Sequence, residues 1–179
     1  MREIVDVNTG EVRLGGGKII LRSIAIGSCI VVAAYDFKKK IGALAHIMLP
    51  GRAERKTPER TRYAADAIDE MLNKMTEAGA NKDDIDACLV GGGNVLRKGN
   101  DTICEDNIRS TTHLLEERSI PVRAAVLGGT KRKGVFLDVE NATISYTEGD
   151  GKEKLLWKST GTPNAIRGFW EPGKEVTLR

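Results

Sequence analysis

The sequence predicts a single α/β domain of mixed strands with two helices. Short apolar segments bounded by turn residues outnumber the segments with helical periodicity. A chain of 179 residues, 40% apolar and 30% charged, is long enough for one hydrophobic core and has the composition of an ordinary soluble domain. No apolar run reaches the roughly 18 residues that a membrane-spanning helix needs. The N-terminus has no apolar stretch typical of a signal peptide, so we expect no membrane insertion.

The predicted strands are apolar segments in which β-branched residues are frequent. The first two flank the turn signal Asn8-Thr9-Gly10, and a polar, lysine-rich link separates the fourth and fifth, which indicates a hairpin. Strands are expected at residues 4–7, 11–14, 19–26, 30–35, 41–49, 85–90, 122–127, 135–139 and 142–146.

Two segments have the pattern of helices. The first starts at Thr57-Pro58, an N-cap followed by proline at the first helical position, and runs to about Ala78. Its apolar residues recur at spacings of three and four, as expected for one buried face. The second spans residues 107–118 and ends before Pro121.

The fourth and fifth predicted strands bring together residues that can carry chemistry. Cys29 follows a Gly27-Ser28 turn, and His46 lies on the fifth strand. If Tyr35 lies opposite Lys40, then Cys29 lies opposite His46 on the same face, with Cβ atoms roughly 4.5–5.5 Å apart. A one-residue slip would send the two side chains to opposite faces.

These residue types are those of a cysteine hydrolase. Such a site needs a thiolate, a base that takes its proton, and donors for the oxyanion. Cys29 and His46 supply the first two, and the turn at Gly27 and Ser28 brings backbone N–H groups near a substrate carbonyl. The alternative is that Cys29 is a buried structural residue, and the chemistry of the residues alone leaves both interpretations open.

The remaining cysteines and the second histidine are expected to play no catalytic part. Cys88 lies inside an apolar strand, and acidic neighbours raise the pKa of the Cys104 thiol. His113 is expected to be an exposed helical residue. None of the cysteines has the spacing of a zinc site. An odd number of cysteines without an export signal indicates free thiols in the cytoplasm.

Two glycine-rich segments are poor matches to nucleotide-binding loops. Residues 91–93 follow a strand but do not open a helix, and residues 129–134 lack the lysine of a phosphate loop. We expect residues 91–93 to serve instead for close backbone approach to the site.

The net charge of +3 is unevenly distributed. Residues 36–62 hold eight Lys/Arg against three acidic residues. This excess is expected to flank the proposed site, and it is either a solvated surface or a patch that steers an acidic protein partner toward the site. Nucleic acid is not expected as a partner, because no aromatic residues interleave with the basic ones.

A family resemblance narrows these alternatives. Residues 21–51 resemble the signature of CheD, the chemoreceptor glutamine deamidases, and the similarity extends over about residues 1–147. The matching residues in the signature are Gly27, Ser28, Cys29, Tyr35, Asp36, Gly42, Ala45, His46, Leu49 and Pro50. Weaker similarity continues at Tyr63-Ala64, Gly91-Gly92, Asn107 and Leu127-Gly128-Gly129.

The resemblance implies a Cys-His-Ser site. The family's nucleophile and base match Cys29 and His46, and its catalytic threonine, six positions before the cysteine, matches Ser23. Two departures occur: residues 103–107 lack the family's glycine and arginine, and a later glycine is absent near Asn141. They bear on contacts with partner or substrate more than on the chemistry.

The resemblance also implies the fold and the biological role. The fold would be a layered α/β sandwich similar to the catalytic domains of cytotoxic necrotizing toxins. The activity would be conversion of glutamine to glutamate on methyl-accepting chemotaxis receptors, without metal or cofactor. The alternative is a regulatory binding module for a CheC-type phosphatase. Residues 148–179 would be an extension to the deamidase domain, carrying Trp157 and Trp170, whose role the sequence leaves open.

Overall fold

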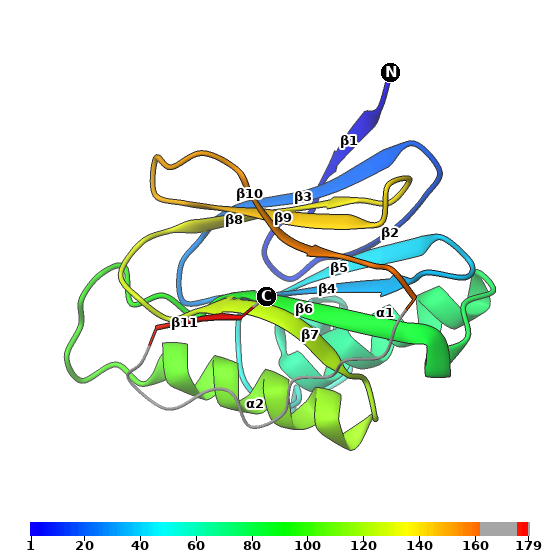
Figure 1. Cartoon of the computed structure of the whole chain (residues 1–179). Coiled ribbons are helices and arrows are strands. Elements are labelled where there is room, and N and C mark those ends of the chain that lie inside the picture. The colour runs from blue at the N-terminus through cyan, green and yellow to red at the C-terminus, as the bar shows by residue number, and fades with distance from the viewer. Residues whose placement is uncertain (162–174, 179) are drawn as a thin grey trace.

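The computed structural model describes residues 1–161 and 175–178. Within these residues two β-sheets lie face to face, and two α-helices cover the outer face of one sheet (Figure 1). The first sheet has the spatial order β1 (Glu3–Asp6), β3 (Ile19–Ile26), β8 (Lys133–Asp138), β9 (Thr143–Glu148) and β10 (Lys154–Lys158). The second has the order β11 (Val176–Leu178), β7 (Val122–Leu127), β6 (Ile85–Gly91), β4 (Ile30–Asp36), β5 (Ile41–Ile47) and β2 (Val12–Gly16).

The predicted class, mixed α/β, is therefore confirmed. The burial of β4 shows how the two sheets and the helices form successive layers. All residues of β4 are buried, because one face packs on the first sheet and the other on the helices. Val31, Ala33 and Tyr35 belong to the core between the sheets. Ile30 and Val32 belong to the core between the second sheet and helices α1 (Ala64–Glu77) and α2 (Ile103–Glu117). A strand covered on both sides appears in the sequence as a continuous apolar run.

The strands on either side of the Asn8-Thr9-Gly10 turn do not pair with each other. β1 pairs in parallel with β3, whereas β2 pairs antiparallel with β5 in the other sheet. The turn therefore carries the chain from one sheet to the other. This crossing places residues 7–9 against the face of β5 that carries His46.

Both helices differ from prediction at their N-terminal ends. Thr57 makes no side-chain cap hydrogen bond, and Pro58–Arg62 forms a separate 3₁₀ turn, interrupted at the extended residue Tyr63 before α1 begins. A second 3₁₀ turn, Lys82–Asp84, precedes β6. Helix α2 starts at Ile103, earlier than expected, and the Ile103 N–H donates to the Asp101 carboxylate at 3.1 Å. Glu105 and Asp106 in its first turn interrupt the apolar pattern, so the sequence did not indicate that the helix starts here.

The described part of the C-terminal segment belongs to both sheets. β10 pairs antiparallel with β9, and β11 pairs antiparallel with β7 at the edge of the second sheet. Leu156 is buried in the core between the sheets and Trp157 packs against that core. Trp170 lies outside the described residues. The division at residues 147 and 148 stays a prediction. No helix in the described chain is long and apolar enough to cross a membrane.

Candidate active site

A β-bulge in β3 shapes the approach to Cys29. Ser23 pairs with Val135 and Ile26 pairs with Lys133, so one extra residue is accommodated on β3 between these pairs. Ala25 within this bulge has a φ of 57°, a left-handed conformation that is uncommon for a residue with a side chain. Such bulges reorient the side chains beside them and are frequent near active sites. The chain then turns through residues 27–28 and reaches Cys29 immediately before β4.

The structure brings Ser23 and His46 together. The Ser23 hydroxyl lies 2.8 Å from His46 Nδ1 and 2.8 Å from the Val7 carbonyl oxygen, and His46 Nδ1 is 3.3 Å from the same oxygen. A carbonyl only accepts hydrogen bonds, and a serine hydroxyl has one proton to give. We therefore infer that Ser23 donates to Val7 and that His46 Nδ1–H donates to Ser23. The Nε2 atom of His46 is then the unprotonated nitrogen.

His46 has the properties of a neutral base. It is 4% exposed, and burial lowers its pKa below the ordinary 6.5, with the Val7 carbonyl opposing that shift. Its Nε2 atom is buried and has no hydrogen-bond partner among the described residues. A buried imidazole with a free Nε2 lone pair is able to accept a proton at neutral pH.

The predicted pairing of Cys29 with His46 was wrong in register. Val31, not Cys29, lies opposite His46, because Asp36 still belongs to the strand and pairs with Ile41. The Asp36 carboxylate accepts backbone N–H groups of Lys39 and Asn81 at 3.0 and 2.9 Å, which holds this residue in place. The predicted register is displaced by two residues, and an even displacement keeps a side chain on the same face of the sheet. The prediction that Cys29 and His46 share a face is therefore correct: Cys29 packs with Val31 at the core between the sheets.

Cys29 is a half-buried thiol. Burial raises its pKa above the ordinary 9.0, and the Thr9 hydroxyl acts in the opposite direction. The resting pair is therefore a neutral thiol and a neutral imidazole, and no hydrogen bond joins Cys29 to Nε2 of His46.

The contacts of Val7 with His46 and of Thr9 with Cys29 were not predictable from the sequence. The turn that carries Val7 and Thr9 is fixed to β5 by hydrogen bonds from the Gly10 N–H to the His46 carbonyl at 2.8 Å and from the His46 N–H to the Glu11 carbonyl at 3.0 Å. The Asn-Thr-Gly sequence indicates a turn but not the strand against which the turn lies.

Residues 91–93 approach the loop that carries Cys29 closely, as predicted. A Cβ atom on Gly91 would overlap the carbonyl oxygen of Cys29. The N–H groups of Gly92 and Gly93 donate to the carbonyls of Cys29 and Gly27, each at 2.8 Å. Across the described chain, the N–H groups of Ser28 and Cys29 donate to no other residue's backbone carbonyl.

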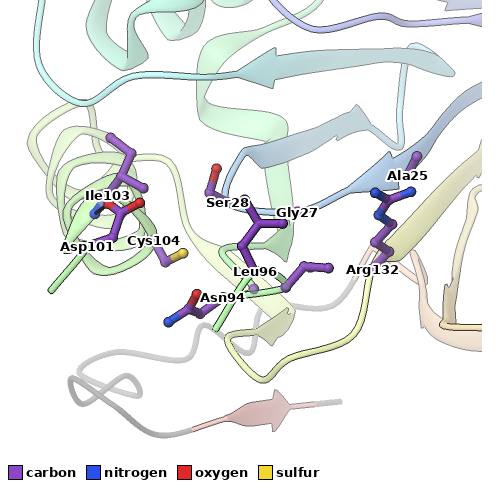
Figure 2. A pocket seen from close by; sticks show the side chains of 11 residues that line it. Ala25, Gly27, Ser28, Asn94, Leu96, Asp101, Ile103, Cys104 and Arg132 are labelled. Atoms are coloured by element: carbon purple, nitrogen blue, oxygen red, sulfur yellow. Dashed lines mark hydrogen bonds between the residues drawn. The ribbon is translucent and has the colours of Figure 1, made fainter. Parts of the chain in front are cut away.

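Two cavities lie along the segment formed by β3 and the turn before Cys29. One of about 370 Å³ is lined by Gly27, Ser28, Asn94, Leu96, Asp101 and Arg132, among others, with Ser28 at its wall (Figure 2). The other, of about 350 Å³, is lined by Val7, Thr9, Arg22, Ile24 and His46. His46 lines the second cavity together with Thr9, whose hydroxyl acts on the Cys29 thiol, whereas Cys29 itself lines neither of the two.

The other titratable candidates lie apart from this arrangement or are unreactive. Cys88 is fully buried, which raises its pKa strongly. Burial also raises the pKa of Cys104, and Asp101 and Glu105 contribute less, so the predicted direction is confirmed but its main cause is different. His113 is exposed on α2 and lies 3.3 Å from Glu117. In residues 1–161 and 175–178, no group of three or more His, Cys, Asp or Glu side chains has the geometry to hold a metal ion.

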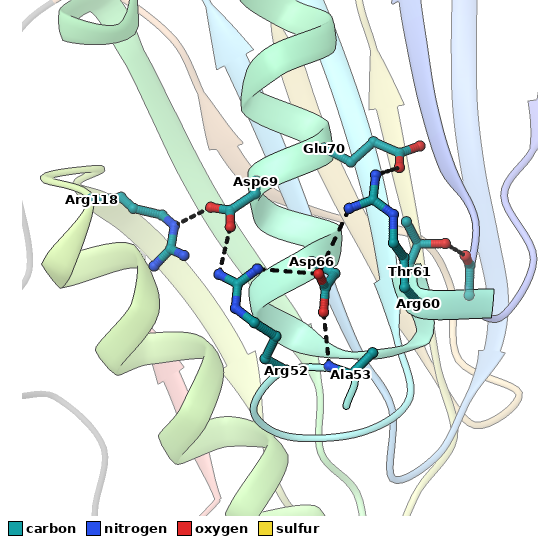
Figure 3. A network of polar contacts seen from close by, with 9 residues as sticks. Arg52, Ala53, Arg60, Thr61, Asp66, Asp69, Glu70 and Arg118 are labelled. Atoms are coloured by element: carbon teal, nitrogen blue, oxygen red, sulfur yellow. Dashed lines mark hydrogen bonds and ion pairs between the residues drawn. The ribbon is translucent and has the colours of Figure 1, made fainter. Parts of the chain in front are cut away.

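Several basic residues of the 36–62 segment are neutralised by ion pairs. Arg52 contacts Asp66 and Asp69 at 3.1 and 2.7 Å, and Asp69 also contacts Arg118 at 2.6 Å, which joins the loop after β5 to both helices (Figure 3). Arg60 lies 3.2 Å from Glu70 in the same network (Figure 3).

The lysines at 38–40 are also not beside the site. They lie beyond the far end of β4, whose seven residues span about 20 Å from Cys29. Lys38 is moreover paired with Asp84 at 2.7 Å. The prediction that the basic excess flanks the site is therefore wrong for these lysines, because β4 runs away from Cys29 and places them at its opposite end.

The fold and this arrangement define a class: a two-sheet α/β protein with a half-buried thiol on the same face as an oriented, neutral imidazole. Comparison with known proteins gives the family. The family model described as CheD chemotactic sensory transduction matches residues 48–148, more than half of the chain. The chain belongs to the CheD family. Ser23, Cys29 and His46 precede the matched range.

Individual relatives agree with this assignment. The chain is 40% identical over 151 residues to the probable chemoreceptor glutamine deamidase CheD of Chlorobium luteolum, covering 83% of this chain and 75% of the relative. It is 31% identical over 151 residues to the chemoreceptor glutamine deamidase CheD of Halalkalibacterium halodurans, covering 81% and 93%.

Among solved structures, a hypothetical protein YfiH of Bacillus licheniformis is similar to this chain. The TM-score is 0.40, with 14% identity over 72% of this chain and 60% of that one. A likeness at that level carries no argument about the fold or function.

Proposed function

We propose that this chain hydrolyses the side-chain amide of glutamine residues on chemoreceptors, with Cys29 as nucleophile, His46 as base and Ser23 as the residue that orients the base. The names of the relatives support the reaction and the substrate class. The observation that carries the site assignment is the Ser23–His46 contact of 2.8 Å, which leaves the Nε2 atom of His46 free on the face that also bears Cys29.

The proposed reaction proceeds through a thioester. His46 Nε2 takes the proton of the Cys29 thiol as the sulfur attacks the carboxamide carbon. The N–H groups of Ser28 and Cys29, which donate to no other residue's backbone carbonyl in the described chain, hold the oxygen that becomes negative. The imidazolium gives its proton to the departing nitrogen, and ammonia leaves. Neutral His46 then activates a water that hydrolyses the thioester, which releases glutamate and restores the thiol.

Ser23 and Val7 support the charged intermediate form of His46. When Nε2 gains a proton, the Nδ1–H bond to the Ser23 hydroxyl and the Val7 carbonyl is retained. A neutral hydroxyl and a carbonyl stabilise imidazolium less than a carboxylate does, but they fix the ring in position. Gly27 and Ser28 contact the substrate through the backbone of the turn and the cavity of about 370 Å³.

The setting that fits this activity is the cytoplasm, where the signalling domains of chemoreceptors lie. We also propose a CheC-type phosphatase as a partner, and a likeness of this layered fold to the catalytic domains of cytotoxic necrotizing toxins. The second candidate function is a regulatory binding module for that phosphatase. The free Nε2 atom on the same face as a half-buried thiol favours the enzyme.

The test is incubation of the full chain with the cytoplasmic fragment of a chemoreceptor, followed by peptide mass spectrometry. The expected result is conversion of particular receptor glutamines to glutamate, with ammonia released in equal amount. A receptor that keeps all its amides, together with binding of the chain to the phosphatase, would favour the binding module instead.

A further inference from the structure

The loop that carries Cys29 is held at three consecutive carbonyl groups. Backbone N–H groups of Gly93 and Gly92 bind the carbonyls of Gly27 and Cys29 at 2.8 Å each. The carbonyl between them, that of Ser28, accepts instead from the side chain of Asn107, at 2.9 Å. This is the one of the three contacts that depends on a side chain.

The same carboxamide also binds the segment that follows His46. Asn107 Nδ2 donates a second hydrogen bond, to the Met48 carbonyl at 2.9 Å. Ser28 directly precedes the proposed nucleophile, and Met48 comes two residues after the proposed base. One NH₂ group on α2 therefore spans the two segments that hold the thiol and the imidazole, and Figure 2 shows the first turn of α2 beside Ser28.

The orientation of this amide is fixed by its partners. Both partners are carbonyl oxygens, which only accept, so the NH₂ group and not the oxygen must face them. Asn107 is fully buried, and its Oδ1 atom finds no partner among the described residues. The side chain thus makes its hydrogen bonds to the two site segments and to nothing else in that part of the chain.

We propose that Asn107 is a positioning residue for the reaction: it sets the distance between Cys29 and His46 by holding the carbonyls of Ser28 and Met48 on one amide group. This inference rests on the proposed function for its effect on turnover, but its geometric effect is independent of the substrate. Cys29 and His46 are not hydrogen-bonded at rest, so their separation depends on how the two segments are held. Small displacements of reacting groups lower turnover steeply.

The test compares Asn107→Leu, which keeps the branched shape and removes both donors, with Thr111→Val as the matched control. Thr111 is fully buried one turn further along α2, and its hydroxyl has no hydrogen-bond partner in the described chain. Asn107→Ala serves as a second variant that introduces no bulk. Circular dichroism and thermal unfolding establish that each variant is folded.

Two readouts separate positioning from a merely structural role. Labelling of Cys29 by iodoacetamide across pH, with the site identified by peptide mapping, reports how well His46 assists the thiol. In Asn107→Leu we expect labelling at neutral pH to fall about tenfold and its rise to move to higher pH. With a glutamine substrate we expect kcat to fall about 10- to 100-fold while KM changes by less than about threefold. Thr111→Val should match the wild type in both.

Each outcome decides the inference. Labelling in Asn107→Leu that equals or exceeds that of the wild type overturns it. If Asn107→Leu and Asn107→Ala both fail to fold while Thr111→Val folds, Asn107 supports the fold rather than the site, and the inference is overturned. If the wild type converts no glutamine but Asn107→Leu still slows labelling, the proposed function fails and the positioning role stands.

Discussion

Removing the Ser23 hydroxyl tests how His46 is oriented. In the variant Ser23→Ala, His46 Nδ1 and the Val7 carbonyl lose a shared partner that lies 2.8 Å from each. Ser23 is 2% exposed, so water does not readily replace the hydroxyl. The change therefore acts on stability and on turnover, and the two effects can be measured separately.

The expected magnitude follows from what remains after the substitution. A lost hydrogen bond lowers the free energy of unfolding by about 0.5–1.5 kcal/mol, and by about 1–3 kcal/mol where a buried group is left unpaired. Here Nδ1–H and the Val7 carbonyl are 3.3 Å apart and pair with each other. We therefore expect a loss of about 1–2 kcal/mol. A similar loss in the transition state corresponds to about a tenfold fall in kcat, since about 1.4 kcal/mol is a factor of ten.

The assay is ammonia release from a glutamine-containing peptide, with urea unfolding of the same samples. Ser23→Thr is the matched control, because it keeps the hydroxyl, and it should retain activity. In Ser23→Ala the Cys29 thiol should still react with an alkylating agent. A Ser23→Ala protein with unchanged kcat would refute the idea that this hydroxyl orients the base.

Three further predictions concern the base, the pH dependence and the charges. His46→Ala should lower kcat by about 10²–10⁴-fold, the usual scale for a general base, whereas His113→Ala should be near neutral; the reverse order would reject the site. Because burial lowers the pKa of His46, the base stays neutral below pH 6.5. We therefore expect kcat/KM to be constant from neutral pH to pH 6.5 and to fall only as the pH drops through the lowered pKa of His46. The folded state then binds fewer protons than the unfolded state, so the free energy of unfolding measured in urea should also decline as pH falls below 6.5, and a decline confined to alkaline pH would contradict this. Reversing the charges at residues 55–56 should slow receptor deamidation at low salt more than reversing those at 39–40, because residues 39–40 lie at the far end of β4. Equal effects of the two changes would argue against local steering.

Much of the fold was predictable because its strands are short apolar segments between turn residues. The bounds of the strand Ile19–Ile26 and of Val122–Leu127 agree with prediction. The C-terminal strands were not predicted. Lys154–Lys158 is a short edge strand with charged residues at both ends, and Val176–Leu178 has only three residues, so neither has the length or alternation that identifies a strand.

The candidate site was predictable in its residues but not in its geometry. The Gly-Ser-Cys turn and the histidine on the next strand could be found from spacing, and parity correctly placed Cys29 and His46 on one face. The register was wrong because the Asp36 side chain binds the backbone N–H groups of Lys39 in the turn and of Asn81 outside the hairpin, which holds Asp36 in the strand. The Val7 carbonyl, which faces His46, is brought by a strand crossing between sheets that local sequence does not encode.

The central claim is that the Cys29 sulfur attacks the glutamine amide, and one comparison tests it most directly. The full-length Cys29→Ala and Cys88→Ala proteins are each incubated with the same receptor fragment, and glutamate formation is measured by mass spectrometry. Cys88 is fully buried in the core between the sheets and serves as the matched thiol control. We predict that Cys29→Ala forms no glutamate above the level without enzyme, while Cys88→Ala retains activity. Glutamate formation by a folded Cys29→Ala protein at the wild-type rate would contradict the account.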